Sequence, residues 1–420
     1  MRATLLILTL TCLAPRPAAA EQVAPAPAGA PADSDPPAAA AIDALKHLEL
    51  GVGLDTYYGW NMNRPIGRVN LLRAYDVTSN NFSLSQATVI VASPVDPDAG
   101  RRFGGRLDLQ YGAATETLQG SLSNEPRPQA YRPIFQAFGT YVFPVAAGLT
   151  VDFGKWASAI GYEGNYTKDQ ITYSRSFWFN YLPFYHMGAR VGLRLNDALT
   201  LNYWITNGTQ QTEAFNNYKD QMIGAVLRPQ KHVAWTLNYY LGQEHPDVQP
   251  VGSSAGPALP TQAGLSVTPI DPAPDGRLHI LDSYVEWQAT PGTLVAIEGD
   301  YVVNRQWEEE GLGRSAAPAT VAGGAAYARR QLTRHTAAAV RVEYLRDRDG
   351  LFSGTSEILS ETTLTYEFRV EGGFLLRAEW RRDAARSPFF LTAASGSRST
   401  DQQTLTAGLI WWWGNKRGPW

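Results

Sequence analysis

The stretch Thr293–Asn304, TLVAIEGDYVVN, changes between apolar and polar side chains with a period of two. Its apolar positions are Val295, Ile297, Tyr301 and Val303, and the positions between them include Glu298 and Asp300. Successive side chains of a β-strand point to opposite faces of the sheet, so this pattern predicts a strand with one apolar and one charged face. Residues 361–369, 374–383 and 102–111 repeat the pattern.

The same period recurs through most of the chain and predicts sixteen strands of a length that suits tilted membrane-spanning strands. Their predicted ranges are 48–61, 80–93, 102–112, 132–144, 148–157, 182–195, 198–206, 219–228, 232–243, 277–289, 293–305, 319–331, 335–346, 357–369, 373–384 and 401–413.

The connections between these strands alternate strictly in length. Those after even-numbered strands are short: 94–101, 145–147, 196–197, 229–231, 291–292, 333–334 and 370–372. Those after odd-numbered strands are longer: 62–79, 113–131, 158–181, 207–218, 244–276, 306–318, 347–356 and 385–400. A soluble sandwich has no reason to sort its loops in this way. We therefore predict an all-β fold, a closed up-and-down antiparallel transmembrane β-barrel of about 16 strands, with short periplasmic turns and long external loops.

The composition fits a barrel whose apolar side chains face lipid and whose charged side chains face a wet lumen. Charged residues make up only 18% of the 420 residues, which is little for a soluble surface. The chain has 12 Trp and 20 Tyr, and predicted outward aromatics gather near strand ends, as interfacial girdles require. Ordinary core packing and carbohydrate platforms are the other readings of these aromatics. The net charge of −3 favours no nucleic-acid partner.

The N-terminal residues predict export. Residues 1–20 have a basic start, a short apolar run and the small residues Ala18-Ala19-Ala20, which is typical of a cleavable signal peptide. Residues 21–47 are rich in Ala and Pro and predict a flexible periplasmic spacer. The barrel would then occupy residues 48–420. The only cysteine, Cys12, lies in the predicted signal peptide.

The strand phase places eight arginines and thirteen acids on the inner face. So many charges need a wetted lumen, although some could serve only to brace the wall as ion pairs. The excess of acids predicts a weak cation preference. The residues that we predict to line or narrow the pore are Arg102, Arg106, Asp108, Glu163, Lys168, Asp169, Arg175, Arg190, Arg194, Glu298, Asp300, Arg341, Glu343, Glu367, Arg377, Glu379 and Arg381.

Loop 158–181 is the candidate constriction because it combines several tyrosines with charges of both signs. If it lies in the lumen, Arg175→Glu is expected to shift the selectivity toward cations. Alternatively, Glu163 and Arg175 could pair with each other and merely brace the loop.

Residues with the spacing of a catalytic or metal site are missing from the sequence. The six histidines are scattered, and the chain contains neither HExxH nor GxSxG. We therefore predict no enzyme activity, no catalytic residue, no metal and no cofactor. An outer-membrane phospholipase would need a Ser–His pair that faces the membrane. His186, next to a loop, is the only histidine that is even a weak candidate for such a pair.

Five segments of the first half resemble the OmpL-like β-barrel porins of Gram-negative bacteria. They are Gly53–Asn63, Gly104–Gly112, Gly154–Glu163, Tyr173–Gly188 and Leu199–Gly208. The series GK, GYE, YSRS, P and H.G is the most specific part, and the second half matches mainly by strand rhythm. The resemblance implies an outer-membrane diffusion channel. It gives no substrate.

The sequence thus predicts a bacterial outer-membrane porin for passive diffusion of small hydrophilic solutes or ions. A structural or adhesive surface barrel with a closed lumen is the alternative. Expected partners are outer-membrane lipid, lipopolysaccharide, the barrel-insertion machinery, small hydrophilic solutes and further copies of the chain in a homo-oligomer. The last predicted strand, with Leu405, Leu409, Trp411 and Trp413, carries the apolar alternation typical of an insertion signal, but residues 414–419 separate it from Trp420.

Overall fold

The computed structural model describes residues 47–119, 125, 127–250, 270–272, 276–305 and 317–420. The predicted signal peptide, 1–20, and all of the predicted spacer, 21–47, except His47 lie outside the described residues. The same holds for most of the predicted loop 244–276 and for parts of loops 113–131 and 306–318.

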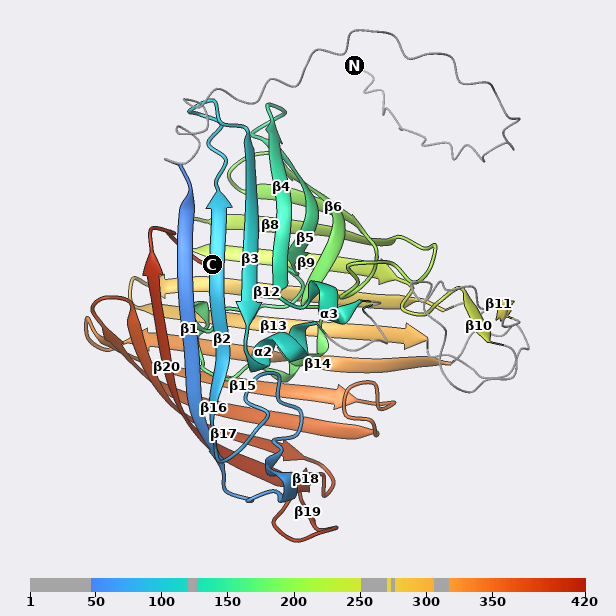
Figure 1. Cartoon of the computed structure of the whole chain (residues 1–420), viewed down its shortest axis with the longest axis vertical. Coiled ribbons are helices and arrows are strands. Elements are labelled where there is room, and N and C mark those ends of the chain that lie inside the picture. Colours follow the sequence, from blue (N-terminus) through green and yellow to red (C-terminus); the bar gives the residue numbers. More distant parts are fainter. Residues whose placement is uncertain (1–46, 120–124, 126, 251–269, 273–275, 306–316) are drawn as a thin grey trace. The chain divides into compact units, whose positions relative to one another are not determined.

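Sixteen strands form one closed antiparallel barrel, in which each strand pairs with its neighbours in the sequence and the last strand pairs with the first (Figure 1). The strands are β1 (Glu49–Asn61), β2 (Asn81–Ser93), β3 (Phe103–Tyr111), β4 (Ile134–Phe143), β5 (Leu149–Ala157), β6 (Tyr185–Arg194), β7 (Leu199–Thr206), β8 (Asp220–Gln230), β9 (Val233–Gly242), β12 (Leu278–Thr290), β13 (Thr293–Arg305), β14 (Pro318–Gln331), β15 (Thr336–Asp347), β16 (Glu357–Val370), β17 (Phe374–Ala385) and β20 (Asp401–Gly414). All sixteen predicted strands are confirmed, and their ends move by three residues at most.

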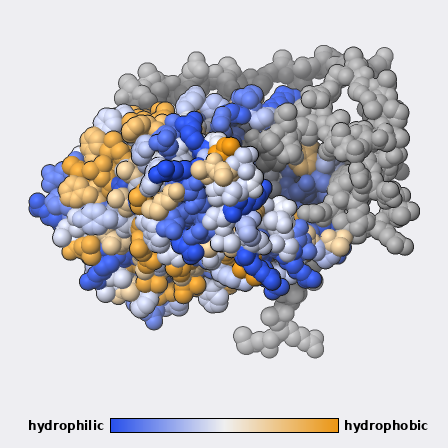
Figure 2. Space-filling model, turned by 90° about the horizontal axis from the view of Figure 1, so that it is seen from below, coloured by the Kyte–Doolittle hydropathy of each residue, from blue (hydrophilic) through white to orange (hydrophobic). Residues whose placement is uncertain are grey.

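The predicted faces are also those of the structure, as β13 illustrates. Ile297 and Tyr301 are 61% and 45% exposed on the outside, whereas Glu298 and Asp300 are 4% and 5% exposed on the inside. Closing the sheet gives every barrel strand a partner on both sides, so the apolar outer face can meet lipid without an open sheet edge. In Figure 2, hydrophobic residues form patches at the left and along the lower edge of the view. Hydrophilic residues occupy much of the middle of the same view.

The links sort by length as predicted. Links such as 144–148 and 291–292 are short, and links such as 158–184 and 386–400 are long. We call the two ends of the barrel the short-turn end and the long-loop end. The long links contain small elements: η1 (Ile66–Arg68), α2 (Ala113–Leu118), α3 (Pro128–Tyr131), η2 (Thr167–Asp169), α4 (Phe177–Tyr181), β10 (Val248–Pro250), β11 (Ile270–Pro272), β18 (Phe390–Leu391) and β19 (Arg398–Ser399).

In the described part of the chain, every helix is too short or too polar to cross a membrane.

Cysteine labelling on intact cells tests which end of the barrel faces outward. Ser395, in a long link, and Pro291, in a short turn, are both exposed. We expect Ser395→Cys to react with a membrane-impermeant maleimide and Pro291→Cys to react only after lysis. The single native cysteine, Cys12, lies in the predicted signal peptide, so the background is low. The opposite labelling pattern would mean that the short-turn end, and not the long-loop end, faces the cell exterior.

Candidate functional site

The lumen contains the link between β5 and β6, residues 158–184, which we call the inner loop. Its hydroxyl and backbone groups bond to Asp55 on β1 and Asp108 on β3, and also to Glu343 on β15 and Glu379 on β17. A segment that contacts strands so far apart around the barrel has to cross its interior. The inner loop therefore fills part of the lumen.

Tyr173 is held on three sides. Its backbone N–H donates to Glu379 Oε2 at 2.6 Å, and its hydroxyl donates to Asp55 Oδ1 at 2.8 Å. Its ring lies on Gly408 of β20, where an added Cβ would come within 2.4 Å of a ring carbon. A residue without a side chain is therefore required at position 408. Glu379 also accepts the N–H of Ser174 at 3.0 Å.

The short helix α4 begins over a wall carboxylate. Both oxygens of Glu343 accept the N–H of Phe177 at 2.9 Å, and the Ser176 side chain accepts the N–H of Phe179 at 2.8 Å. The first N–H groups of a helix have no partner within it, and these acceptors satisfy them. Glu343 thus fixes where the helix starts.

Arg341 is fully buried and joins the wall to the inner loop. Its Nη1 lies 2.7 Å from Glu163 Oε1 and donates to the carbonyl of Ser174 at 2.8 Å, while its Nε donates to Glu361 at 3.0 Å. The alternative that Glu163 pairs with Arg175 is wrong. Arg175 instead donates to the carbonyls of Gly164, Tyr173 and Asn165 at 2.7–3.0 Å.

Arg175 is 1% exposed, so its charge is not presented to the lumen. The expectation that Arg175→Glu would act on selectivity loses its basis, because this residue holds the loop in shape.

Two further arginines of β17 bind inner-loop carbonyls. Arg377 donates to Thr167 and Thr172 at 2.8 and 3.0 Å, and pairs with Glu367 at 3.0 Å. Arg381 donates to the carbonyl of Arg175 and pairs with an aspartate on its own strand. These side chains lie beneath the loop and are buried.

The tip of the inner loop contacts β3 and the C-terminal residue. The Tyr166 hydroxyl donates to Asp108 Oδ2 at 2.5 Å, and Asp108 pairs with Arg106 at 2.8 Å. Lys168 lies 2.5 Å from Asp169 and 5.0 Å from the centre of the Trp420 ring. Burial lowers the pKa of the Lys168 ammonium, and the charge of Asp169 opposes this shift.

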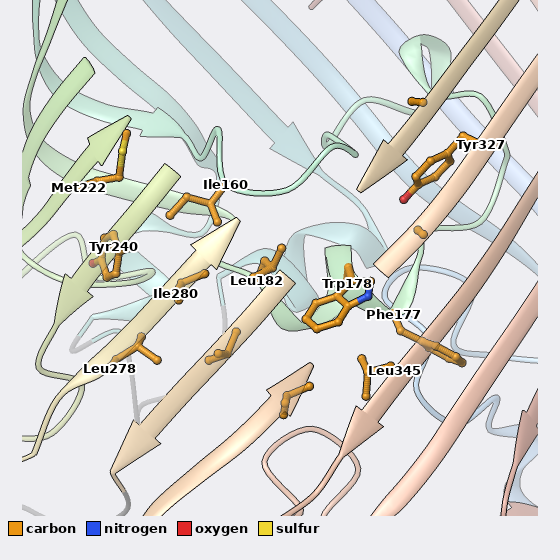
Figure 3. Close-up of a cluster of buried hydrophobic side chains, with 14 of the residues drawn as sticks. Ile160, Phe177, Trp178, Leu182, Met222, Tyr240, Leu278, Ile280, Tyr327 and Leu345 are labelled. Atoms are coloured by element: carbon orange, nitrogen blue, oxygen red, sulfur yellow. The ribbon is translucent and has the colours of Figure 1, made fainter. Parts of the chain in front are cut away.

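An apolar surface of the inner loop packs against the opposite wall. Phe177, Trp178 and Leu182 lie among wall side chains such as Ile280 and Leu345 (Figure 3). Inward-facing apolar residues at this level are compatible with a polar lumen only because the loop covers them. The periodicity of single strands did not reveal which inward positions would be covered.

The wall formed by β3 to β6 keeps its arginines accessible. Arg102, directly before β3, donates to the carbonyl of Val142 at 3.3 Å. Arg190 pairs with Asp152 at 2.6 Å, and their side chains are 25% and 9% exposed. Arg194 pairs with Asp197 near the short-turn end, and its side chain is 56% exposed.

The inward-facing charges that remain accessible have a different balance of acids and arginines from the full set of inward-facing charges. Of the thirteen predicted inward acids, eleven are buried, and only Glu49 and Glu286 are partly exposed. Of the eight predicted inward arginines, three are buried, which leaves Arg102, Arg106, Arg190, Arg194 and Arg369 in contact with the lumen. The accessible charge is therefore mainly basic.

Glu298 and Asp300 lie close together on β13 but away from the arginines described above. Glu298 accepts the N–H of Tyr162 at 2.8 Å and the hydroxyl of Tyr327 at 2.9 Å. Both oxygens of Asp300 are buried and lack a hydrogen-bond partner among the described residues.

His186 does meet a serine. Its Nε2 lies 3.2 Å from Ser158 Oγ, and its Nδ1 lies 3.4 Å from the carbonyl of Gly208. The imidazole is fully buried between the rings of Trp204 and Tyr240 on the inner side of β6. A phospholipase would need this pair on the membrane face, so the geometry is that of a packed structural pair.

A family model matches residues 47–411, nearly the entire described barrel. Its description is Putative beta-barrel porin-2, OmpL-like. The chain belongs to this family. It is therefore an outer-membrane porin barrel, as the resemblance implied, and no curated protein matches it.

Solved porin structures share the fold of this porin at very low sequence identity. The outer-membrane channel DcaP of Acinetobacter baumannii has a TM-score of 0.55 and 7% identity, over 87% of this chain and 97% of that one. An anion-selective porin from Comamonas acidovorans has a TM-score of 0.52 and 7% identity, over 87% and 99%. The trimer form of OmpT from Vibrio cholerae has a TM-score of 0.50 and 10% identity, over 87% and 99%.

The sequence of this porin did not lead us to predict that Trp420 contacts the inner loop or that it packs on two glycines of β1. Trp420 donates its N–H to Asp169 at 2.8 Å and stacks edge-on to Tyr166 at 6.0 Å. Its ring covers Gly51 and Gly53, where an added Cβ would come within 3.1 and 2.6 Å. Two glycines on the inner face of one strand were the available signal.

Gly408→Val tests the anchoring of the inner loop. The new side chain would displace the Tyr173 ring and weaken its bond to Asp55, at a cost of about 1–3 kcal/mol. We expect trypsin to cut the folded barrel after Lys168 or Arg175, which the parent protein protects. Ala407→Val is the matched control because Ala407 faces outward on the same strand. Equal protection in both variants would contradict this anchoring.

Proposed function

We propose that this porin is a passive diffusion channel for small hydrophilic solutes, that the inner loop forms its constriction, and that it prefers anions. The observation that carries the preference is the accessible charge inside the barrel. Eleven of the thirteen wall acids are buried, and five of them accept hydrogen bonds from the inner loop. The arginines of β3 and β6 stay partly exposed.

The contacts of the inner loop support its role as constriction. Wall carboxylates bind its N–H groups, and wall arginines bind its carbonyls, at both sides of the barrel. A loop held in this way narrows the lumen at a fixed place. Any solute must then pass beside the remaining wall, where Arg106 and Arg190 are 18% and 25% exposed in their side chains.

The accessible charge opposes the cation preference that the residue count predicts. A carboxylate whose charge is compensated by a buried arginine or by N–H groups contributes little to the potential at a distant ion. An accessible guanidinium acts on the ion directly. Arginine also forms paired hydrogen bonds with carboxylate and phosphate oxygens, so small organic anions fit this wall better than cations do.

A structural or adhesive barrel with a closed lumen is the competing function. The dense packing of the inner loop favours it, because that packing reduces the free lumen. Single-channel recording separates the two, since a closed barrel gives no conductance steps. We propose no catalytic role, and the burial of the Ser158–His186 pair supports this.

The proposal includes the expected partners. The apolar outer face suits outer-membrane lipid and lipopolysaccharide, and the last strand suits recognition by the barrel-insertion machinery. A homo-oligomer is proposed as well, by analogy with the trimer form of OmpT, a protein of the same fold.

Deletion of residues 164–172 tests the constriction. It removes the loop tip that bonds to Asp55 and Asp108, so we expect single-channel conductance in planar bilayers to rise. Deletion of 393–396, in the link 386–400, is the control and should leave the conductance nearly unchanged. Unaltered conductance after the first deletion would place the constriction elsewhere.

Charge reversal tests the selectivity. In a KCl gradient, we expect the reversal potential of the parent channel to have the sign of anion selectivity. We expect the double variant Arg106→Glu/Arg190→Glu to shift the reversal potential toward that of a cation-selective channel. Arg382→Glu makes the same change on the outer side of β17 and should have a smaller effect. A cation-selective parent channel would refute the proposed preference.

A further inference from the structure

Three carboxylates meet on the inner wall between β12 and β13. Asp282 and Asp300 are direct partners in the strand register, and Glu298 lies two residues along the strand from Asp300. One oxygen from each of the three lies within 4.8 Å of the others. All three residues are at least nine-tenths buried, with exposed fractions of 2%, 5% and 4% for Asp282, Asp300 and Glu298.

Three oxygens of this cluster lack a hydrogen-bond partner among the described residues. They are Asp282 Oδ1 and both oxygens of Asp300, and all three are buried. The remaining oxygens bind neutral donors: Asn238 donates to Asp282 Oδ2 at 2.7 Å, and Tyr162 and Tyr327 donate to Glu298. A buried polar group without a partner is costly, and a buried carboxylate is more so.

The neighbouring strands supply no positive charge to the cluster. The register positions beside it hold Asn238 on β9, and Gly323 and Ala325 on β14. Several other acids of the barrel wall, in contrast, have an arginine partner. Glu361 lies 3.0 Å from Arg341, and Glu367 lies 3.0 Å from Arg377. Like charges directly opposite each other destabilise a sheet, and these neighbouring positions hold no counter-charge.

We propose that Asp282, Glu298 and Asp300 bind a calcium ion. Carboxylate oxygens are the ligands that hard divalent cations prefer. Calcium binds oxygens at about 2.3–2.6 Å, so ligands on opposite sides of the ion lie about 4.6–5.2 Å apart, which accommodates the observed spread. Magnesium needs oxygens at about 2.0–2.1 Å in a strict octahedron and gives up its water ligands reluctantly, so a buried set of three wall carboxylates suits it less well.

The ion would also act on the inner loop. The N–H of Tyr162 binds Glu298, and the carbonyl of Ala159 accepts from Asn238 at 3.0 Å, so the first residues of the loop lie directly over the cluster. Offsetting two of the three negative charges would therefore stabilise both the β12–β13 pair and the start of the inner loop. This site is independent of whether the lumen conducts.

The test uses the full-length barrel refolded in detergent without lipopolysaccharide, whose phosphates bind calcium themselves. After treatment with EDTA, we expect millimolar CaCl₂ to raise the Tm by several degrees. We also expect Tb³⁺ to bind and to luminesce on excitation of tyrosine, because the hydroxyl of Tyr327 contacts Glu298, and CaCl₂ should displace it.

Asp300→Asn should abolish the Tm rise and the Tb³⁺ signal, because it removes the carboxylate that has no protein partner. Asp197→Asn, which changes an exposed acid at the short-turn end, should retain both. Failure of the parent protein to respond to CaCl₂ would overturn the proposal without any variant. An equal response of Asp300→Asn, or an equal Tm rise with MgCl₂, would also overturn it.

Discussion

Charge buried inside the barrel is the constraint on which the rest of this structure depends. Because the outer face of a membrane barrel is apolar, the charged side chains of each strand are directed inward, where burial without partners is unfavourable. The inner loop supplies the partners as backbone groups: Glu379 and Glu343 accept its N–H groups, and Arg341 and Arg377 donate to its carbonyls. The loop itself has almost no regular secondary structure, so its backbone needs these wall groups equally.

This exchange explains how the lumen becomes basic although its acids are more numerous. Each acid that holds the loop is withdrawn from water, as the burial of Asp108 and Glu343 illustrates. The arginines of β3 and β6 remain partly exposed, and Arg190 keeps a quarter of its side chain accessible. In the proposed channel, the same contacts that shape the constriction would also set the sign of the charge that a solute meets.

The cluster of Asp282, Glu298 and Asp300 is an exception, because its acids have no compensating arginine among the described residues. Wherever the inner loop or a neighbouring strand offers an arginine or a row of N–H groups, the wall acids are compensated. Between β12 and β13 the loop offers chiefly the N–H of Tyr162, which Glu298 takes, and the neighbouring positions are Asn, Gly and Ala. A bound cation restores the compensation found elsewhere in the wall.

The sequence by itself determined the sixteen strands, their inward and outward faces and the order of long and short links, because strand periodicity and turn length are local properties. It also identified the inner loop by its tyrosines and charges. Only the tertiary structure decided that Glu163 pairs with Arg341 rather than Arg175, and that Trp420 covers Gly53. Those contacts join residues far apart in the chain across a lumen, and no periodicity encodes which inward side chains a crossing loop will cover.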